Sequence, residues 1–159
     1  MDEKHATDLS AWTGKNATRA HETPLSRESK ARVLLVDDDP VVLEVLTERL
    51  REAGYEVYTR EASLGTSQWL ADKRPDLVVL DVNMPALSGG ELAQVIHRRP
   101  SLRRTGVILY SSVSQEELEE MVRRAGALGA ISKASDERTF MAAFERLALK
   151  HRVQTLQNR

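Results

Sequence analysis

The stretch "VLLVDDDP", residues 33–40, runs four apolar residues directly into three consecutive aspartates and a proline. A short apolar run rich in β-branched residues is typical of a buried parallel strand. Three like charges at the end of such a strand repel one another and lose solvation. A turn or a helix cap needs one aspartate at most, so the other two require a separate explanation.

Alternating strand-like and helix-like segments follow this stretch to the end of the chain. Residues 40–54 favour a helix, because Asp39 can cap it, Pro40 suits its first position and Gly54 can end it. Helical spacing predicts that its buried face contains Val42, Val45, Leu46, Leu50 and Ala53. Further strands are predicted at residues 55–59, 75–81, 106–111 and 129–132, with helices at about 62–72, 89–99 and 114–127 and from about 135 onward.

Five strand–helix units within about 120 residues imply one α/β domain, a parallel sheet with helices on both faces. In such sheets, ligands bind outside the carboxyl ends of the strands, at the topological switch point. The predicted strands end on polar residues at this edge: Asp37 and Asp38 after the first, Asp81 at the third, Ser111 at the fourth and Lys133 at the fifth.

We expect these side chains to lie within several ångströms of one another. Three neighbouring carboxylates require a cation, and hard oxygen ligands without Cys or His select Mg²⁺ or Mn²⁺. Lys133 adds an ammonium group and Ser111 a hydroxyl, which together with a metal suit a phosphoryl group. Any one of these residues could be a simple turn or cap residue, as Asp39 is, but the agreement of four strand ends favours a site.

Composition excludes several other functional classes. The 159 residues are 41% hydrophobic, and 23 Lys and Arg nearly balance 24 Asp and Glu, which gives no strong field for nucleic acid or an anionic membrane. The absence of cysteine excludes disulfides, thiol catalysis and thiolate metal sites. The longest apolar runs are far shorter than a membrane span, so we expect a soluble, cytoplasmic protein.

The chain divides into three parts by composition. Residues 1–31 contain no Val, Ile, Phe or Tyr, which predicts a flexible tail; Trp12 either docks on the domain or a partner or is a chance aromatic. Residues 32–150 form the predicted domain. Residues 151–159 either extend the last helix or fray.

Four motifs carry a family resemblance: "LLVDDDP" (34–40), "DLVVLDVNMPALSGGEL" (76–92), "VILYSS" (107–112) and "GALGAISK" (126–133). As a set they resemble the receiver domain of response regulators, the phospho-acceptor module of two-component signalling, over residues 32 to about 150. The resemblance implies the flavodoxin-like fold, with five parallel strands in the order 2-1-3-4-5.

The resemblance also implies roles for the strand-end residues. Asp81 would be the phospho-acceptor, attacking a phosphohistidine donor. Asp37 and Asp38 would be the acidic pair that holds Mg²⁺ (or Mn²⁺), with Asp38 the more direct ligand. Asp81 itself and the backbone carbonyl of Asn83 would complete the metal ligands.

Two features depart from the family pattern. Ser111 and Lys133 match the residues that bind the phosphoryl group and switch with it. However, the aromatic residue that usually stands three positions before the lysine is Ala130, so the switch position is degenerate. The lysine is usually followed by a proline, often in a cis peptide, and here by Ala134.

These implications favour a single-domain response regulator that a histidine kinase or phosphotransfer protein phosphorylates. Its output would be protein contact, through the predicted fourth helix, fifth strand and last helix, or transfer of the phosphoryl group along a relay. No turnover of an independent substrate is expected, and a homodimer is left open.

Two other classes compete with this hypothesis. The Ala130 and Ala134 departures allow a pseudo-receiver, a scaffold that works unphosphorylated. A phosphatase similar to the haloacid dehalogenases would also use a strand-end aspartate and Mg²⁺. Such enzymes need a second carboxylate two residues after the nucleophile, where this chain has Asn83.

Overall fold

A single parallel sheet forms the centre of the computed structural model, which describes residues 29–61, 65–85 and 88–159. The strand order β2-β1-β3-β4-β5 confirms the predicted fold. Most of the predicted flexible tail lies outside the described residues. The elements are β1 (Arg32–Val36), α1 (Pro40–Glu52), β2 (Glu56–Arg60), α2 (Thr66–Lys73), β3 (Leu77–Asp81), α3 (Gly89–Arg98), η2 (Pro100–Leu102), β4 (Gly106–Ser111), α4 (Gln115–Ala125), β5 (Gly129–Ser132) and α5 (Glu137–Gln157).

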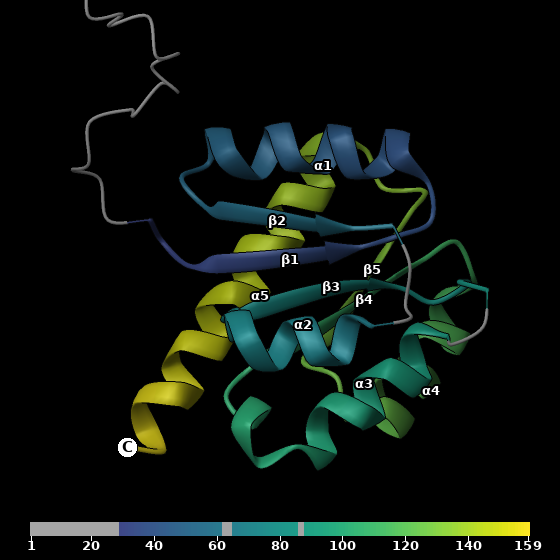
Figure 1. Ribbon diagram of the computed structural model, residues 1–159. Coiled ribbons are helices and arrows are strands. Elements are labelled where there is room, and N and C mark those ends of the chain that lie inside the picture. The colour runs from purple at the N-terminus through teal and green to yellow at the C-terminus, as the bar shows by residue number, and fades with distance from the viewer. Residues whose placement is uncertain (1–28, 62–64, 86–87) are drawn as a thin grey trace, which may run out of the picture.

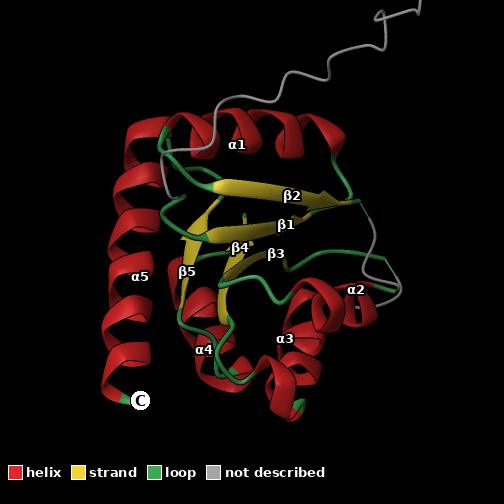
Figure 2. Cartoon of the chain, turned by 60° about the vertical axis from the view of Figure 1, so that its left-hand side comes forward, coloured by secondary structure: helices red, strands yellow, loops and turns green. Residues whose placement is uncertain are grey.

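Helices cover both faces of the sheet (Figures 1 and 2). Alternation along β1 sends Val33 and Leu35 into the core beneath α1 and α5. Leu34 and Val36 enter the second core, beneath α2, α3 and α4. Because both faces are covered, β3 and β4 are buried along their whole length, which explains their continuous apolar sequences.

Helix α1 begins as predicted, and four of the five residues predicted on its buried face pack on the core, Val42 and Ala53 only in part. The Asp39 side chain accepts a hydrogen bond from the backbone N–H of Val41 at 2.9 Å and caps the helix. The buried stripe consists of Leu43, Leu46 and Leu50. The prediction that Val45 is buried was wrong, since its side chain is 37% exposed. Leu43 takes that place because it lies one turn before Leu46 on the side that meets the sheet.

Helix α5 is the longest helix, with 21 residues. It starts after Asp136, whose side chain accepts a hydrogen bond from the backbone N–H of Thr139, and its first half packs Phe140, Phe144 and Leu147 into the core. It continues to Gln157, so residues 151–157 extend the helix. In the described part of the chain, no helix combines the length and the apolar character needed to cross a bilayer.

Helix α3 begins directly against the end of β3. A Cβ atom at Gly89 would lie 2.3 Å from the backbone oxygen of Asp81. Ser88 caps the helix in a capping box with Glu91. Glycine is therefore required at Gly89 because of space, and this contact fixes how close α3 lies to the end of the strand that carries Asp81.

This close approach predicts opposite effects of two neighbouring substitutions. Gly89→Ala is expected to destabilise the protein by about 1–3 kcal/mol, because backbone must move to admit the methyl group. Gly90→Ala is the matched control: a Cβ there meets only the Ser88 Oγ at 3.9 Å, and alanine has the better helix propensity. Urea unfolding measures both, and equal stabilities for the two variants would contradict the packing.

Candidate functional site

The carboxyl edge of the sheet gathers the polar residues that end the strands. Asp37 follows β1, Asp81 is the last residue of β3, Ser111 is the last residue of β4 and Lys133 follows β5. Parallel pairing places these ends at one edge, with Asp81 aligned to Tyr110 across β3 and β4. The edge lies on the side to which the strand arrows point in Figure 1.

Three carboxylates lie together there. Asp37, Asp38 and Asp81 each offer an oxygen atom, and these oxygens all lie within 4.8 Å of one another. Asp37 and Asp81 are each only 3% exposed, whereas Asp38 is exposed. Two buried like charges at this separation require a positive charge close by.

Lys133 supplies that charge. Its Nζ lies 2.8 Å from Asp37 Oδ2, as a hydrogen bond, and 3.2 Å from Asp81 Oδ1. Burial acts to lower the pKa of Lys133, but the hydrogen bond to Asp37 and the charges of Asp37 and Asp81 outweigh it and raise the pKa above its usual value. Lys133 is therefore charged at neutral pH. The stability gained from its raised pKa is complete at neutral pH and is lost only as the pH rises past that pKa.

The donor set fits a hard divalent cation. Three carboxylates and one ammonium leave a formal charge of −2 at the cluster. Carboxylate oxygens are the ligands that Mg²⁺ and Mn²⁺ prefer. Among the described residues, Asp38 has no hydrogen bond or ion pair of its own, so its carboxylate is available to a metal without breaking a contact.

Hydrogen bonds orient the two buried carboxylates. Asp37 Oδ1 accepts from the backbone N–H of Asp39 at 2.9 Å, and Asp81 Oδ1 accepts from that of Asn83 at 3.1 Å. Lys133 also contacts Asp81 through Oδ1. Within the described ranges, all polar contacts of the Asp81 carboxylate therefore involve one oxygen. The other oxygen, Oδ2, remains for a metal or an electrophile.

Ser111 is fully buried at the neighbouring strand end. Its Oγ accepts a hydrogen bond from the backbone N–H of Val113 at 3.3 Å. A hydroxyl that accepts in this way keeps its own hydrogen to donate. Asn83 is exposed beside the cluster, two residues after Asp81.

Tyr110 lies beside the cluster, although the sequence analysis assigned it no role. As strand alternation predicts, its ring faces α1 and α5, whereas Ala130 packs into the core on the other face. The Lys133 Nζ lies 5.3 Å from the Tyr110 ring centroid, in cation–π range, and the ring packs edge-on against Phe140 at 5.7 Å. The signal in the sequence was an aromatic residue directly before Ser111.

The peptide after Lys133 takes the ordinary conformation. No cis peptide bond occurs among the described residues, so the Lys133–Ala134 bond is trans. The backbone N–H of Ala134 donates to Ser132 Oγ at 3.1 Å, and that of Lys133 donates to the Ser111 carbonyl at 2.7 Å. These bonds hold the β5–α5 loop so that Lys133 reaches the carboxylates without a proline.

Comparison with known proteins relates this chain to a large set of signalling proteins. The family model of the response regulator receiver domain matches residues 33–145. The transcriptional regulatory protein PdtaR of Mycobacterium tuberculosis is 35% identical over 103 residues, which cover 64% of this chain and only about half (49%) of PdtaR. Protein PilH of Pseudomonas aeruginosa is 29% identical over 111 residues, covering 70% of this chain and 92% of PilH.

The solved structures give the same relationship. The chemotaxis response regulator CheY4 of Vibrio cholerae superimposes with a TM-score of 0.69 at 26% identity, covering 74% of this chain and 98% of that chain. The residues that match the family model, 33–145, include all five strands except Arg32, together with Asp37, Asp38, Asp81 and Lys133.

The geometry of the cluster predicts how Mg²⁺ affects stability. At a hundred times its dissociation constant, a cation that binds only the folded chain adds about 2.7 kcal/mol to the free energy of unfolding. Asp38→Ala removes one like charge and no hydrogen bond or ion pair among the described residues, so the metal-free melting temperature is expected to stay or rise while the effect of Mg²⁺ is lost.

The control is Asp72→Ala, which removes an exposed carboxylate on α2 and is expected to leave the Mg²⁺ response intact. Thermal melts with and without Mg²⁺ measure all three proteins. An Asp38→Ala protein that is less stable without metal, yet still responds to it, would contradict the assignment.

Proposed function

The chain belongs to the response regulator receiver domain family of two-component signalling, and from this premise we propose that it is a phosphorylation switch with Asp81 as the acceptor. A histidine kinase or a phosphotransfer protein is the proposed donor. In the transfer, a carboxylate oxygen of Asp81 attacks the phosphorus atom while the bond from phosphorus to the donor nitrogen breaks. The product is an acyl phosphate on Asp81 and a free histidine on the donor.

One observation carries this proposal: Lys133 contacts both Asp37 and Asp81 at the carboxyl edge. The ammonium and the Asn83 N–H both hold Oδ1 of Asp81. Asp81 is thereby fixed in one orientation, with Oδ2 left for the attack. Holding a nucleophile in place before reaction removes part of the entropy cost of the transfer.

Asp37, Asp38, Asp81 and the backbone carbonyl of Asn83 are the proposed ligands of Mg²⁺ (or Mn²⁺). When bound, the cation would neutralise the phosphoryl oxygens as the donor approaches. The exposed Asp38 carboxylate is the proposed direct ligand, since it has no other partner among the described residues. Asp37 is anchored by the Asp39 N–H and by Lys133, so it would hold the cation in a fixed position.

Ser111 and Lys133 are proposed to bind the phosphoryl oxygens after transfer. The Ser111 hydroxyl has its hydrogen available, and Lys133 already lies 3.2 Å from the acceptor carboxylate. Neutralising Asp81 weakens the attraction that holds Lys133 there. The phosphoryl group restores that attraction with more charge, so both side chains would be drawn toward it.

The output is proposed to be protein contact or phosphorelay. The surface formed by α4, β5 and α5 is the proposed contact for a downstream protein. Ala130 has no rotamer that can respond to movement of Ser111, so a change at that surface would have to come from backbone shifts in the loops after β4 and β5 or from movement of α4 as a body.

The competing classes have less support. A pseudo-receiver would not need Lys133 held between two carboxylates, and the trans peptide at Ala134 does not displace that lysine. A phosphatase similar to the haloacid dehalogenases would need a second carboxylate at the position of Asn83. The amide side chain of Asn83 cannot act as that general acid or base.

Intact-mass analysis tests the acceptor. With Mg²⁺ and a small phosphodonor such as acetyl phosphate, the chain is expected to gain one phosphoryl group, and Asp81→Asn none. Asp39→Asn is the matched control, because asparagine caps a helix as well as aspartate does, and it should label normally. Unchanged labelling of Asp81→Asn would rule out the assignment.

A phosphoryl mimic tests the degenerate switch. Beryllofluoride with Mg²⁺ is expected to shift backbone amide resonances most at residues 83–89 and 111–115, with smaller changes across α4, β5 and α5. The physical reason is that Ala130 cannot rotate as an aromatic residue would. The largest shifts falling within residues 130–150 would instead reveal another route, for which the contact between Lys133 and Tyr110 is the candidate.

A further inference from the structure

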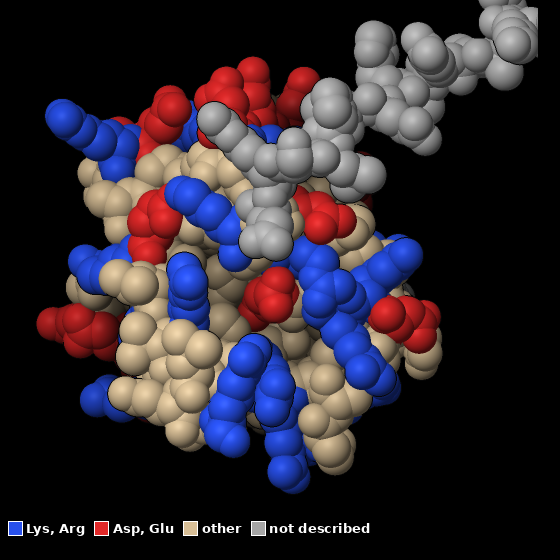
Figure 3. Space-filling model, turned by 90° about the vertical axis from the view of Figure 1, so that its left-hand side faces the viewer, with Lys and Arg blue, Asp and Glu red and all other residues tan. Residues whose placement is uncertain are grey.

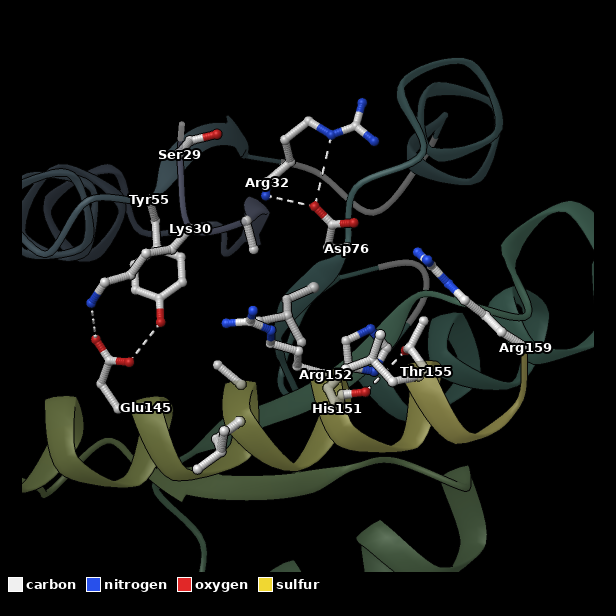
Figure 4. Close-up of a pocket in the computed structure, with 15 residues that line it drawn as sticks. Ser29, Lys30, Arg32, Tyr55, Asp76, Glu145, His151, Arg152, Thr155 and Arg159 are labelled. Atoms are coloured by element: carbon white, nitrogen blue, oxygen red, sulfur yellow. Dashed lines mark hydrogen bonds and ion pairs between the residues drawn. The ribbon is translucent and has the colours of Figure 1, made fainter. Parts of the chain in front are cut away.

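A hollow of about 830 Å³ lies at the amino-end edge of the sheet, opposite the acidic cluster. Its walls are the segment that enters β1, the starts of β1 and β3, and the second half of α5. Figure 3 faces this edge and shows Lys and Arg side chains gathered around the hollow; Figure 4 shows them as sticks. The proposed phosphorylation site uses none of its residues.

Part of the wall is apolar and open to solvent. Leu149 and Leu156 both line the hollow from α5 and are 62% and 56% exposed. Ala148, directly before Leu149, also lines the hollow. Covering large aliphatic side chains of this exposure is favourable because it removes apolar surface from water. The hollow therefore favours an apolar occupant.

The remaining wall has an excess of positive charge. Four cationic side chains line it against two anionic ones. Lys30 pairs with Glu145 at 3.0 Å and Arg32 with Asp76 at 3.8 Å. Arg152 has no ion pair or hydrogen bond in the part of the chain that the structure describes, and the same holds for Arg159. Both anionic groups are thus engaged, whereas two guanidinium groups have no partner among the described residues, which favours an occupant with negative charge.

We propose that the hollow binds residues 8–12 of this chain, the sequence "DLSAW". Trp12 and Leu9 would cover the apolar wall of α5, and Asp8 would pair with Arg152. Asp8 is the only charged residue in the sequence from position 6 to position 14. This stretch therefore combines apolar side chains with one negative charge. It also contains Trp12, whereas the second tryptophan of the chain, Trp69 on α2, packs against Tyr58 on β2.

The stretch of chain between Trp12 and Ser29 is long enough for residues 8–12 to reach the hollow. Ser29 lines the hollow itself, so the chain leaves the domain at the mouth of the site. About 17 residues separate Trp12 from Ser29, a length that spans roughly 26 Å even as a helix. The lining stretch of α5, from Glu145 to Leu156, is about 17 Å long. Trp12 can therefore reach any part of the wall.

Covalent attachment favours this occupant over a separate molecule. A short link gives the attached segment an effective concentration in the millimolar range, so even weak contacts fill the site. A second copy of the chain remains as the competing occupant, and the experiment distinguishes the two.

A spin label on the full chain tests the proposal. Because the chain has no cysteine, Ser10→Cys gives a single labelling position two residues from Trp12. The label is expected to broaden the amide resonances of residues 148–159 and of the starts of β1 and β3. Resonances at the carboxyl edge, around residues 81–83 and 111–113, should stay sharp. Broadening confined to residues next to the label in sequence would overturn the proposal.

Two variants in the labelled chain identify the contacts. Trp12→Ala is expected to reduce the ratio of docked to undocked chain about tenfold, as for loss of an aromatic anchor. Arg152→Glu is expected to reduce it about fivefold or more by placing like charges together. Arg146→Glu is the matched control, because Arg146 is exposed on the same helix but does not line the hollow. Equal effects of the two charge reversals would contradict the proposed contact.

A mixed sample excludes the second copy. Isotope-labelled chain without the spin label is combined with spin-labelled chain of natural abundance. Broadening at residues 148–159 in this sample would show that another molecule supplies the segment, which would overturn the intramolecular assignment. Its absence, together with broadening in the singly labelled chain, supports it. Phosphorylation of Asp81 is not needed in any arm, so failure here leaves the proposed function standing.

Discussion

The ion pair of Lys133 with two buried carboxylates is the interaction on which the carboxyl edge depends. Asp37 and Asp81 are both nearly inaccessible, and their charges would make this edge unfavourable without a cation. Lys133 lies within 3.2 Å of each. Its reach requires that β1, β3 and β5 end at one edge, which the parallel pairing of β1 with β3, β3 with β4 and β4 with β5 ensures. The buried carboxylates therefore depend on the sheet topology, because it brings Lys133 within reach of them.

The two edges of the sheet have opposite chemistry. The carboxyl edge carries the acidic cluster, with a formal charge of −2 including Lys133. The amino edge carries the hollow with its excess of cationic side chains. Over the whole sequence, 23 Lys and Arg residues nearly balance 24 Asp and Glu residues. The net charge near zero therefore does not show that opposite charges gather at opposite edges of the folded sheet. The sequence argument against nucleic-acid or membrane partners rests on the net charge alone.

Some of this organisation could be predicted from sequence, because strand ends are marked by abrupt changes from apolar to polar residues. The aspartates after β1 and β3, Ser111 and Lys133 all stand at such changes, and parallel topology then brings them to one edge. Helical spacing was less informative for α1, since Val45 and Leu43 are both apolar and only packing against the sheet decides which is buried. The contact between Lys133 and Tyr110 joins two strand ends through side-chain rotamers, which residue patterns do not encode. The same holds for the hollow beside α5, whose walls come from distant parts of the chain.

Chemical trapping tests most directly that the carboxylate held by Lys133 is the acceptor. Borohydride reduces an aspartyl phosphate to homoserine, and peptide mapping by tandem mass spectrometry locates that residue. After treatment with Mg²⁺ and acetyl phosphate, homoserine is expected at position 81 and at no other aspartate. Homoserine at position 37 or 38 would contradict the roles assigned to the three carboxylates, and its absence from every position would contradict the acceptor function itself.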